Sequence, residues 1–233
     1  MHYIYHARNT SIGLCVSDLS LSEYSLLVWK SGVVPKDWDN AIISPMYKKG
    51  NKKVCSNYRG ISLLCIAGKL FIYILEKRIR SIVEPKLNDN QCGFRPMRGC
   101  QDQIFCLREI VLKFYEGNKN LILGFVDLEK AFDSVLRAKL FSILYDYGIR
   151  GKLLDSIRGL YRNSTAVIRI CGKLSKSFEV RNGVRQGCGL SPLLFIIYMD
   201  RVLKSANLNG KVKLGNIEIS CLAYADEEHF KKI

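Results

Sequence analysis

Acidic residues follow two short apolar runs in this chain of 233 residues. Residues 121–126 end at Asp127, and residues 221–225 end at Asp226 and Glu227. An apolar run that ends in a carboxylate predicts a buried strand with an acid at its tip, where the desolvated charge needs a cation or a hydrogen-bond donor. Carboxylates from two adjacent tips suit two Mg²⁺ ions about 3.5 to 4 Å apart, as nucleotidyl transfer requires. An Asp in this position is also a common turn former or helix N-cap, so a two-metal site requires the two tips to lie side by side.

The composition indicates a folded and strongly basic protein. Hydrophobic residues make up 48% of the chain and charged residues 24%, which is typical of a globular protein with a substantial core. Thirty-six Lys and Arg outnumber 21 Asp and Glu and leave a formal charge of +15. A field of this sign attracts polyanions, and nucleic acid is a better candidate than a membrane surface because no basic amphipathic helix stands out.

The cysteines and the N-terminus indicate an intracellular protein. The nine cysteines are odd in number, form no Cys-x-x-Cys pair and have no His at metal-ligand spacing, so we expect reduced, structural thiols. The first 15 residues contain His, Arg and Asn where a signal peptide needs apolar residues. No apolar run approaches the roughly 20 residues of a membrane span. We therefore expect a protein of the cytoplasm or nucleus with no membrane partner.

Periodicity and turn signals predict several elements before Asp127, and we assign nothing to residues 1–20. The predicted elements are a helix over 21–30, a strand over 41–46, a basic loop over 48–53, and helices over 70–83 and 102–115. The last helix should bury Ile104, Leu107, Val111 and Phe114, which share one face. The lysine-rich loop is either a solvated turn or a phosphate-binding loop, and both interpretations stay open.

The chain after Asp127 predicts an alternation of helices and hairpins. These elements are helices over 136–147 and 152–162, strands over 166–170 and 177–180, a helix with Ser191 as its N-cap and Pro192 in its first turn, and a hairpin over 211–219 that turns at Gly215 and Asn216. Helices and antiparallel strands mix without βαβ alternation, so the predicted class is α+β.

Six short blocks with distinctive residues occur in order between residues 31 and 226. They are Val34-Pro35 with Trp38, Asn57-Tyr58-Arg59-Gly60-Ile61-Ser62-Leu63-Leu64, Gln91-Cys92-Gly93-Phe94-Arg95, Phe125-Val126-Asp127 with Lys130-Ala131-Phe132-Asp133, Gly183-Val184-Arg185-Gln186-Gly187-Cys188 with Leu190-Ser191-Pro192, and Ala223-Tyr224-Ala225-Asp226. Together they resemble the reverse transcriptases of non-LTR (LINE-type) retrotransposons, and more distantly those of telomerase and group II introns.

This resemblance implies a right-hand polymerase with an antiparallel palm sheet packed on helices. Its fingers would comprise residues 21–120 and 137–187, and its partial palm residues 121–136 and 188–233. Residues 1–20 would be an unassigned leader. The thumb would be absent from a chain that ends at Ile233.

The resemblance also implies RNA-directed DNA polymerase activity, with an RNA template, a DNA primer, dNTP substrates and two Mg²⁺ or Mn²⁺ ions. Asp127 and Asp226 match the metal-binding acids of the family, and the Leu128 carbonyl matches a ligand of the same metal shell. Glu227 stands where the family has a second Asp, as a third acid of the catalytic set that is one methylene longer.

Four residues match nucleotide-binding positions of the family. Lys48 and Arg59 would grip the incoming triphosphate, where cationic donors offset negative charge. Phe132 would be the aromatic gate that collides with a ribose 2′-hydroxyl, and Gln186 would contact the nucleotide beside the template. Without the resemblance, we would interpret Phe132 as a core residue, Arg59 as part of a surface ion pair and Gln186 as a loop residue.

Three functions are consistent with the sequence. The first is a fragment of a LINE-type RNA-directed DNA polymerase, which we expect to extend a primer weakly or not at all without a thumb. The second is a non-catalytic RNA-binding remnant of the same fold. The third is a structural domain with neither activity, against which a steeply salt-dependent RNA affinity would count.

Overall fold

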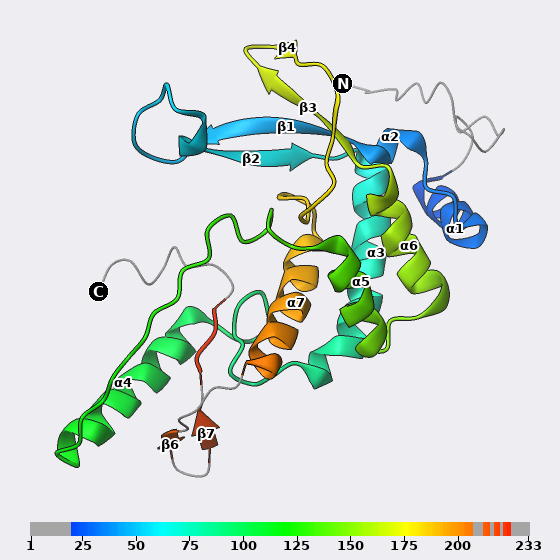
Figure 1. Cartoon of the computed structure of the whole chain (residues 1–233). Coiled ribbons are helices and arrows are strands. Elements are labelled where there is room, and N and C mark those ends of the chain that lie inside the picture. Colours follow the sequence, from blue (N-terminus) through cyan, green and yellow to red (C-terminus); the bar gives the residue numbers. More distant parts are fainter. Residues whose placement is uncertain (1–19, 207–211, 215–216, 220, 225–233) are drawn as a thin grey trace.

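The computed structural model describes residues 20–206, 212–214, 217–219 and 221–224, and Figure 1 shows a helical bundle with a sheet at one end. The predicted leader therefore lies outside the described residues, apart from Ser20. The helices are α1 (Leu21–Ser31), α2 (Lys36–Asp39), α3 (Ile66–Val83), α4 (Cys100–Glu116), α5 (Arg137–Asp146), α6 (Gly151–Arg162) and α7 (Ser191–Ser205), with short 3-10 helices at Cys55–Asn57 and Glu84–Lys86. These bounds confirm the helices that periodicity predicts, to within a few residues.

The bundle core consists mainly of apolar residues from α3, α5, α6 and α7. In α3, Phe71, Leu75, Ile79 and Val83 are almost fully buried at spacings of four residues, and Pro85 follows the end of the helix. Helix α7 is apolar on nearly every side, which suits its place inside the bundle (Figure 1). Each such side chain contributes about 1.5–3 kcal/mol when it leaves water.

The projecting sheet is mixed, not antiparallel throughout. Its strands are β1 (Asn40–Tyr47), β2 (Tyr58–Leu63), β3 (Thr165–Ile170), β4 (Lys173–Leu174) and β5 (Phe178–Glu179), in the order β2-β1-β3-β4, with β5 also paired to β3. β1 pairs antiparallel with β2 but parallel with β3. The predicted strands before and after residue 171 are therefore confirmed, whereas the parallel pairing of β1 with β3 departs from the antiparallel strands that the α+β interpretation expects. The antiparallel palm sheet was expected in residues 121–136 and 188–233, outside this sheet, and stays a prediction. The predicted hairpin near the C-terminus is confirmed as β6 (Val212–Leu214) and β7 (Ile217–Ile219).

The prediction of a buried strand before Asp127 is wrong. Residues 119–128 are extended but belong to no strand, and Ile122, Phe125 and Val126 are 95%, 70% and 83% exposed. Apolar composition favours an extended backbone, but a strand also needs a hydrogen-bonding partner. No described strand pairs with this segment, so composition alone misassigned its burial.

The predicted buried face of α4 is wrong in part, because Leu107 and Phe114 are half-buried but the other two predicted residues are exposed. Ile104 and Val111 are 39% and 43% exposed, whereas Gln103 and Ile110 are the buried residues of this helix. Gln103 Nε2 donates to the Asn90 carbonyl at 3.1 Å, so α4 packs through a polar contact with a loop. Figure 1 shows α4 extending away from the bundle, so that within the described part of the chain no second helix covers its apolar residues.

The start of α7 differs from the prediction by one residue. Leu190 occupies the N-cap position, and Ser191 is the first helical residue, fully buried. Its hydroxyl lies 3.3 Å from the Tyr161 hydroxyl on α6, so it pairs between helices and does not cap its own. None of the helices in the described part of the chain has the length and apolarity needed to cross a membrane.

Candidate active site

Asp127 and Leu128 lie at the end of the exposed extended segment, immediately before a tight turn. The turn is closed by hydrogen bonds from the Asp133 and Ser134 amides to the Lys130 carbonyl, at 2.9 and 3.0 Å. A carboxylate and a main-chain carbonyl at exposed residues are hard oxygen donors of the kind that Mg²⁺ prefers. Their chemistry therefore fits a divalent ion.

The other acids predicted for the metal site, Asp226 and Glu227, lie outside the described residues. Among the residues that the structure does describe, no three His, Cys, Asp or Glu side chains come together as a metal-binding group. The distance between the two acidic tips therefore stays a prediction.

A loop from the third sequence block lies against the chain just before Asp226. The Cys92 amide donates to the Ala223 carbonyl at 3.1 Å, and the Ala223 amide donates to the Asn90 carbonyl at 3.0 Å. Gln91 and Ala223 thus form a single parallel bridge. Two blocks that are more than a hundred residues apart in sequence are joined here.

Arg95 holds this loop in place from a buried position. It is 8% exposed, and its guanidinium donates to the Glu84 carboxylate at 2.7 Å and to the carbonyls of Asn88 and Gln91 at 2.7 and 3.0 Å. Hydrogen bonds from a charged group to main-chain carbonyls fix a loop more firmly than neutral ones. The loop is therefore braced before it reaches Ala223.

Phe132 lies among other aromatic rings. It stacks on Phe195 of α7, with ring centroids 4.9 Å apart and an interplanar angle of 12°, and it meets Phe94 edge to face at 6.2 Å and 86°. Its ring is half-buried against the core. Two aromatic contacts restrict the positions that this ring can take.

The loop that carries Gln186 contacts both β2 and the turn around Phe132. The Ser62 amide donates to the Gln186 carbonyl at 2.7 Å, while the Val184 amide donates to the Phe132 carbonyl at 2.9 Å. Gly183, with φ of 79°, packs so tightly that an added Cβ would lie 2.8 Å from the Asp133 Cα. The structure therefore brings the loop that carries Gln186 against the turn that carries Phe132, and both residues are predicted to bind the nucleotide.

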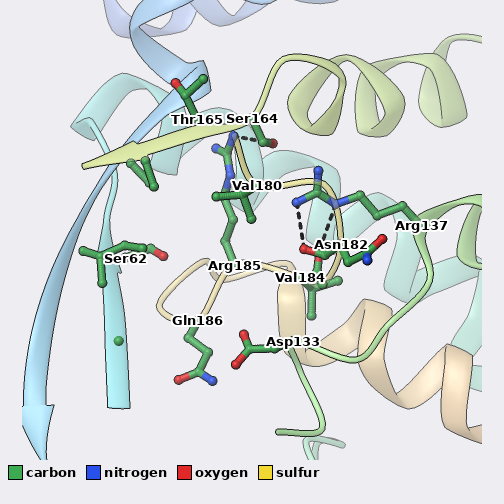
Figure 2. Close-up of a pocket in the computed structure, with 15 residues that line it drawn as sticks. Ser62, Asp133, Arg137, Ser164, Thr165, Val180, Asn182, Val184, Arg185 and Gln186 are labelled. Atoms are coloured by element: carbon green, nitrogen blue, oxygen red, sulfur yellow. Dashed lines mark hydrogen bonds between the residues drawn. The ribbon is translucent and has the colours of Figure 1, made fainter. Parts of the chain in front are cut away.

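Figure 2 shows the cavity beside this loop, with Asp133 and Gln186 pointing toward one another. The cavity has a volume of about 190 Å³ and is lined by polar groups that include Ser62, Asn182 and Arg185. The pKa of the Asp133 carboxyl is raised above its usual value, because partial burial disfavours the charged form. The positive charge of nearby Lys130 offsets part of this effect.

Sequence reasoning missed two arginines that anchor the loop. Arg185 is 8% exposed and donates to the carbonyls of Trp38 and Leu160 at 2.8 and 3.0 Å. It also donates to the Ser164 hydroxyl at 2.9 Å (Figure 2). Its place beside Gln186 in the fifth block was the only signal.

Arg137, which lies in none of the six blocks, is the second anchor. Its guanidinium donates to the carbonyls of Gly183, Asn182 and Tyr161, at 2.9, 3.2 and 3.1 Å. It is 9% exposed, and this desolvation lowers the pKa of the guanidinium. The guanidinium groups of both arginines also lie over the Tyr161 ring. The Cζ atom is 4.9 Å from the ring centroid for Arg137 and 5.7 Å for Arg185.

Lys48 and Arg59 both belong to the hairpin of β1 and β2. The Lys48 amide donates to the Asn57 carbonyl at 2.9 Å, and Arg59 faces Met46 across the strands. The tip also carries Lys49, Lys52 and Lys53, all exposed. The lysine-rich segment thus forms the end of a hairpin, with both predicted triphosphate-binding residues on it.

Comparisons with known proteins agree with the six blocks. The family described as reverse transcriptase (RNA-dependent DNA polymerase) matches residues 47–228. A 149 kDa protein of transposon TX1 from Xenopus laevis is 28% identical over 85% of this chain and 15% of its own length. The Pol polyprotein of retrotransposable element R2DM from Drosophila melanogaster is 27% identical, over 91% and 20%.

A third relative is the Pol polyprotein of retrotransposable element R2 from Popillia japonica, which is 30% identical over 84% of this chain and 28% of its own length. The chain thus spans between 15% and 28% of these three relatives. The length of the family match, with retrotransposon proteins as the relatives, shows that the chain belongs to the reverse transcriptase (RNA-dependent DNA polymerase) family of non-LTR retrotransposons.

Proposed function

We propose that this chain forms the fingers and part of the palm of an RNA-directed DNA polymerase that extends a DNA primer on an RNA template. The contact between the loop of Gln186 and the turn of Phe132 carries the proposal, because on a chain of this family the two segments together would form one wall of a nucleotide-binding site. The fingers would comprise residues 21–120 and 137–187, and the partial palm residues 121–136 and 188–233.

Reverse transcriptases use divalent metal ions such as Mg²⁺. Asp127, the Leu128 carbonyl and Asp226 would hold the ions here, with Glu227 as the third acid. Bound Mg²⁺ or Mn²⁺ would supply Lewis-acid activation of the primer hydroxyl and charge neutralisation at the triphosphate. The chain's own part is to present the Asp127 carboxylate and the Leu128 carbonyl at exposed residues, immediately before the turn that the Lys130 carbonyl closes.

The other predicted residues would bind and orient the nucleotide. Lys48 and Arg59, on the β1–β2 hairpin, would donate to the triphosphate, where each charged hydrogen bond is worth more than a neutral one. Gln186 would contact the nucleotide from a loop whose main chain is fixed at Ser62. The Phe132 ring would lie beneath the sugar and leave no space for a 2′-hydroxyl.

The proposal is tested by primer extension on an RNA template with dNTPs, with and without Mg²⁺. Because the chain spans only 20% of the R2DM polyprotein, the assay should include a completed chain, which we define as residues 1–233 followed by the next polymerase segment of that relative. We expect metal-dependent extension by the completed chain. A completed chain that folds and binds RNA but makes no product in either Mg²⁺ or Mn²⁺ would contradict the proposal.

The Phe132→Val variant of the completed chain should accept ribonucleotides more readily. Loss of the ring opens space for a 2′-hydroxyl, so the preference for dNTP over rNTP should fall by about tenfold or more, within the range for one changed pocket contact. The measurement is kcat/KM for matched dATP and ATP opposite the same template base. Phe132→Tyr, which keeps the ring, is the control, and an unchanged ratio in Phe132→Val would make Phe132 an ordinary core residue.

Non-catalytic RNA binding is the second candidate function, and the exposed lysines of the β1–β2 hairpin favour it. We expect RNA affinity to fall steeply with salt, because each neutralised phosphate releases counterions. Replacing Lys48, Lys49, Lys52 and Lys53 by Gln should reduce the slope of log affinity against log salt by about 1 for each lysine that contacts a phosphate.

The control for this measurement removes the same charge elsewhere. Lys69, Lys77, Lys139 and Lys152 are exposed lysines on α3, α5 and α6. Their replacement by Gln should leave the slope closer to that of the parent. Equal slopes in the two fourfold variants would show that the hairpin is not an RNA-binding surface.

A further inference from the structure

Phe94 has an unusual backbone conformation beside the candidate gate. Its φ is 54°, in the left-handed region that bulky side chains rarely adopt. Such a conformation persists only where the surrounding structure holds it, and it is concentrated at functional sites. The residue before it, Gly93, donates its amide to the Gln91 side chain at 3.0 Å.

Two arginines brace Phe94 in this conformation. Arg95, the next residue, is fastened to Glu84 and to the carbonyls of Asn88 and Gln91. Arg80 of α3 donates to the Phe94 carbonyl at 3.3 Å and also pairs with Glu84 at 3.3 Å. The main chain on both sides of Phe94 is therefore held by hydrogen bonds.

The braced loop directs the Phe94 ring at Phe132. The two rings meet edge to face, with centroids 6.2 Å apart. Phe94 is 39% exposed, so its ring is not simply part of the core. The second partner of Phe132 is Phe195, which is 2% exposed in α7 and therefore rigidly placed.

We propose that Phe94 is a specificity-determining residue that fixes the position of the Phe132 ring and so sets the discrimination between deoxyribose and ribose. The inference rests on the proposed function, in which Phe132 is the gate. A gate that excludes one hydroxyl by overlap depends on the ring position to a fraction of an ångström. Phe195 restricts the Phe132 ring through the stacked contact, and Phe94 restricts it through the edge-to-face contact.

The same loop links the gate to the acidic tip. Cys92, two residues before Phe94, donates its amide to the Ala223 carbonyl, three residues before Asp226. One braced loop thus contacts both the chain that leads to the predicted metal ligand and the ring beneath the predicted sugar position. Phe94 is therefore placed to keep the gate in register with that chain.

The inference is tested by the dNTP-to-rNTP ratio of three variants of the completed chain. Phe94→Gly removes the ring, and glycine adopts the positive φ of this position without steric strain, so folding should be preserved. Its ratio should fall by about threefold to tenfold, the scale of one aromatic contact. Phe94→Tyr keeps the ring edge and should keep the ratio. The control is Phe105→Ala on α4, where a 59% exposed ring is removed away from Phe132.

A second measurement reports on the ring contact in the 233-residue chain itself. The chain is labelled with 4-fluorophenylalanine, and the ¹⁹F resonance of Phe132 is assigned by its loss in Phe132→Tyr. This resonance should shift in Phe94→Gly but not in Phe105→Ala.

The dNTP-to-rNTP ratio separates the specificity role from general destabilisation, because both sugars are measured on the same protein. In the Phe94→Gly, Phe132→Val double variant, the ratio should match that of Phe132→Val alone.

The outcomes separate the inference from the proposed function. If Phe132→Val changes the ratio but Phe94→Gly does not, the inference is wrong and the proposed function stands. An unshifted Phe132 resonance in Phe94→Gly also overturns the inference. If the completed chain without any substitution shows no metal-dependent extension, the proposed function is wrong and the inference is overturned with it.

Discussion

The Asp127→Asn variant of the completed chain should lose primer extension by at least about a hundredfold, the scale seen when one group that stabilises a transition state is removed. The amide keeps the size of the carboxylate but loses the negative charge that a divalent ion needs. RNA affinity should stay close to that of the parent, because phosphate contacts by Lys and Arg supply the binding. Extension in Mg²⁺ and RNA binding at matched salt are the two measurements.

Glu129→Gln is the matched control, since Glu129 is an exposed acid two residues away. It removes the same charge and should retain extension. Asp226→Asn should behave like Asp127→Asn, whereas Glu227→Asp should raise extension because the shorter acid restores the family pattern. Residual extension above about one tenth of the parent in Asp127→Asn would rule out Asp127 as a metal ligand, since it exceeds the loss expected for such a group.

The Arg185→Met variant should lower the free energy of unfolding by about 3 kcal/mol, because several buried acceptors each lose a donor worth about 1–3 kcal/mol. Arg185 donates to the carbonyls of Trp38 and Leu160 and to the Ser164 hydroxyl. In the completed chain, KM for dNTP should also rise by about tenfold or more, because Gln186 would lose its fixed position and small displacements are costly. Urea denaturation and steady-state kinetics measure the two effects.

Arg181→Met is the control for this prediction. Arg181 lies in the same segment, but its side chain is 85% exposed and pairs with Glu179 at 2.9 Å. An exposed pair of this kind contributes less than about 1 kcal/mol, so stability and KM should barely change. If Arg185→Met were no less stable than Arg181→Met, Arg185 would not anchor the loop.

Local sequence determined where the helices lie. The apolar residues of α3 recur at spacings of four, and Pro85 ends the pattern, so the predicted helix over 70–83 overlaps the observed Ile66–Val83. The same reasoning located α5, α6 and α7. The six blocks indicated the family, because their residue types and their order along the chain can be recognised without knowing which side chains contact one another.

Periodicity could not decide which surfaces are buried. Ile104 and Val111 share a helical face and Ile122 and Val126 belong to an apolar run, but all four are exposed. A face or a strand becomes buried only when another element covers it. That covering element is distant in sequence, so its position is a property of the tertiary structure.

The tertiary structure alone showed how the candidate site is braced. Arg185 reaches carbonyls at sequence separations of 147 and 25 residues, and Arg137 reaches across 46 residues to Gly183. In the sequence, each is simply a basic residue in a chain of charge +15. Helix periodicity depends on neighbours within a few residues and is therefore readable from the sequence. A buried arginine depends on which distant carbonyls the fold brings to it, and only the folded chain shows that.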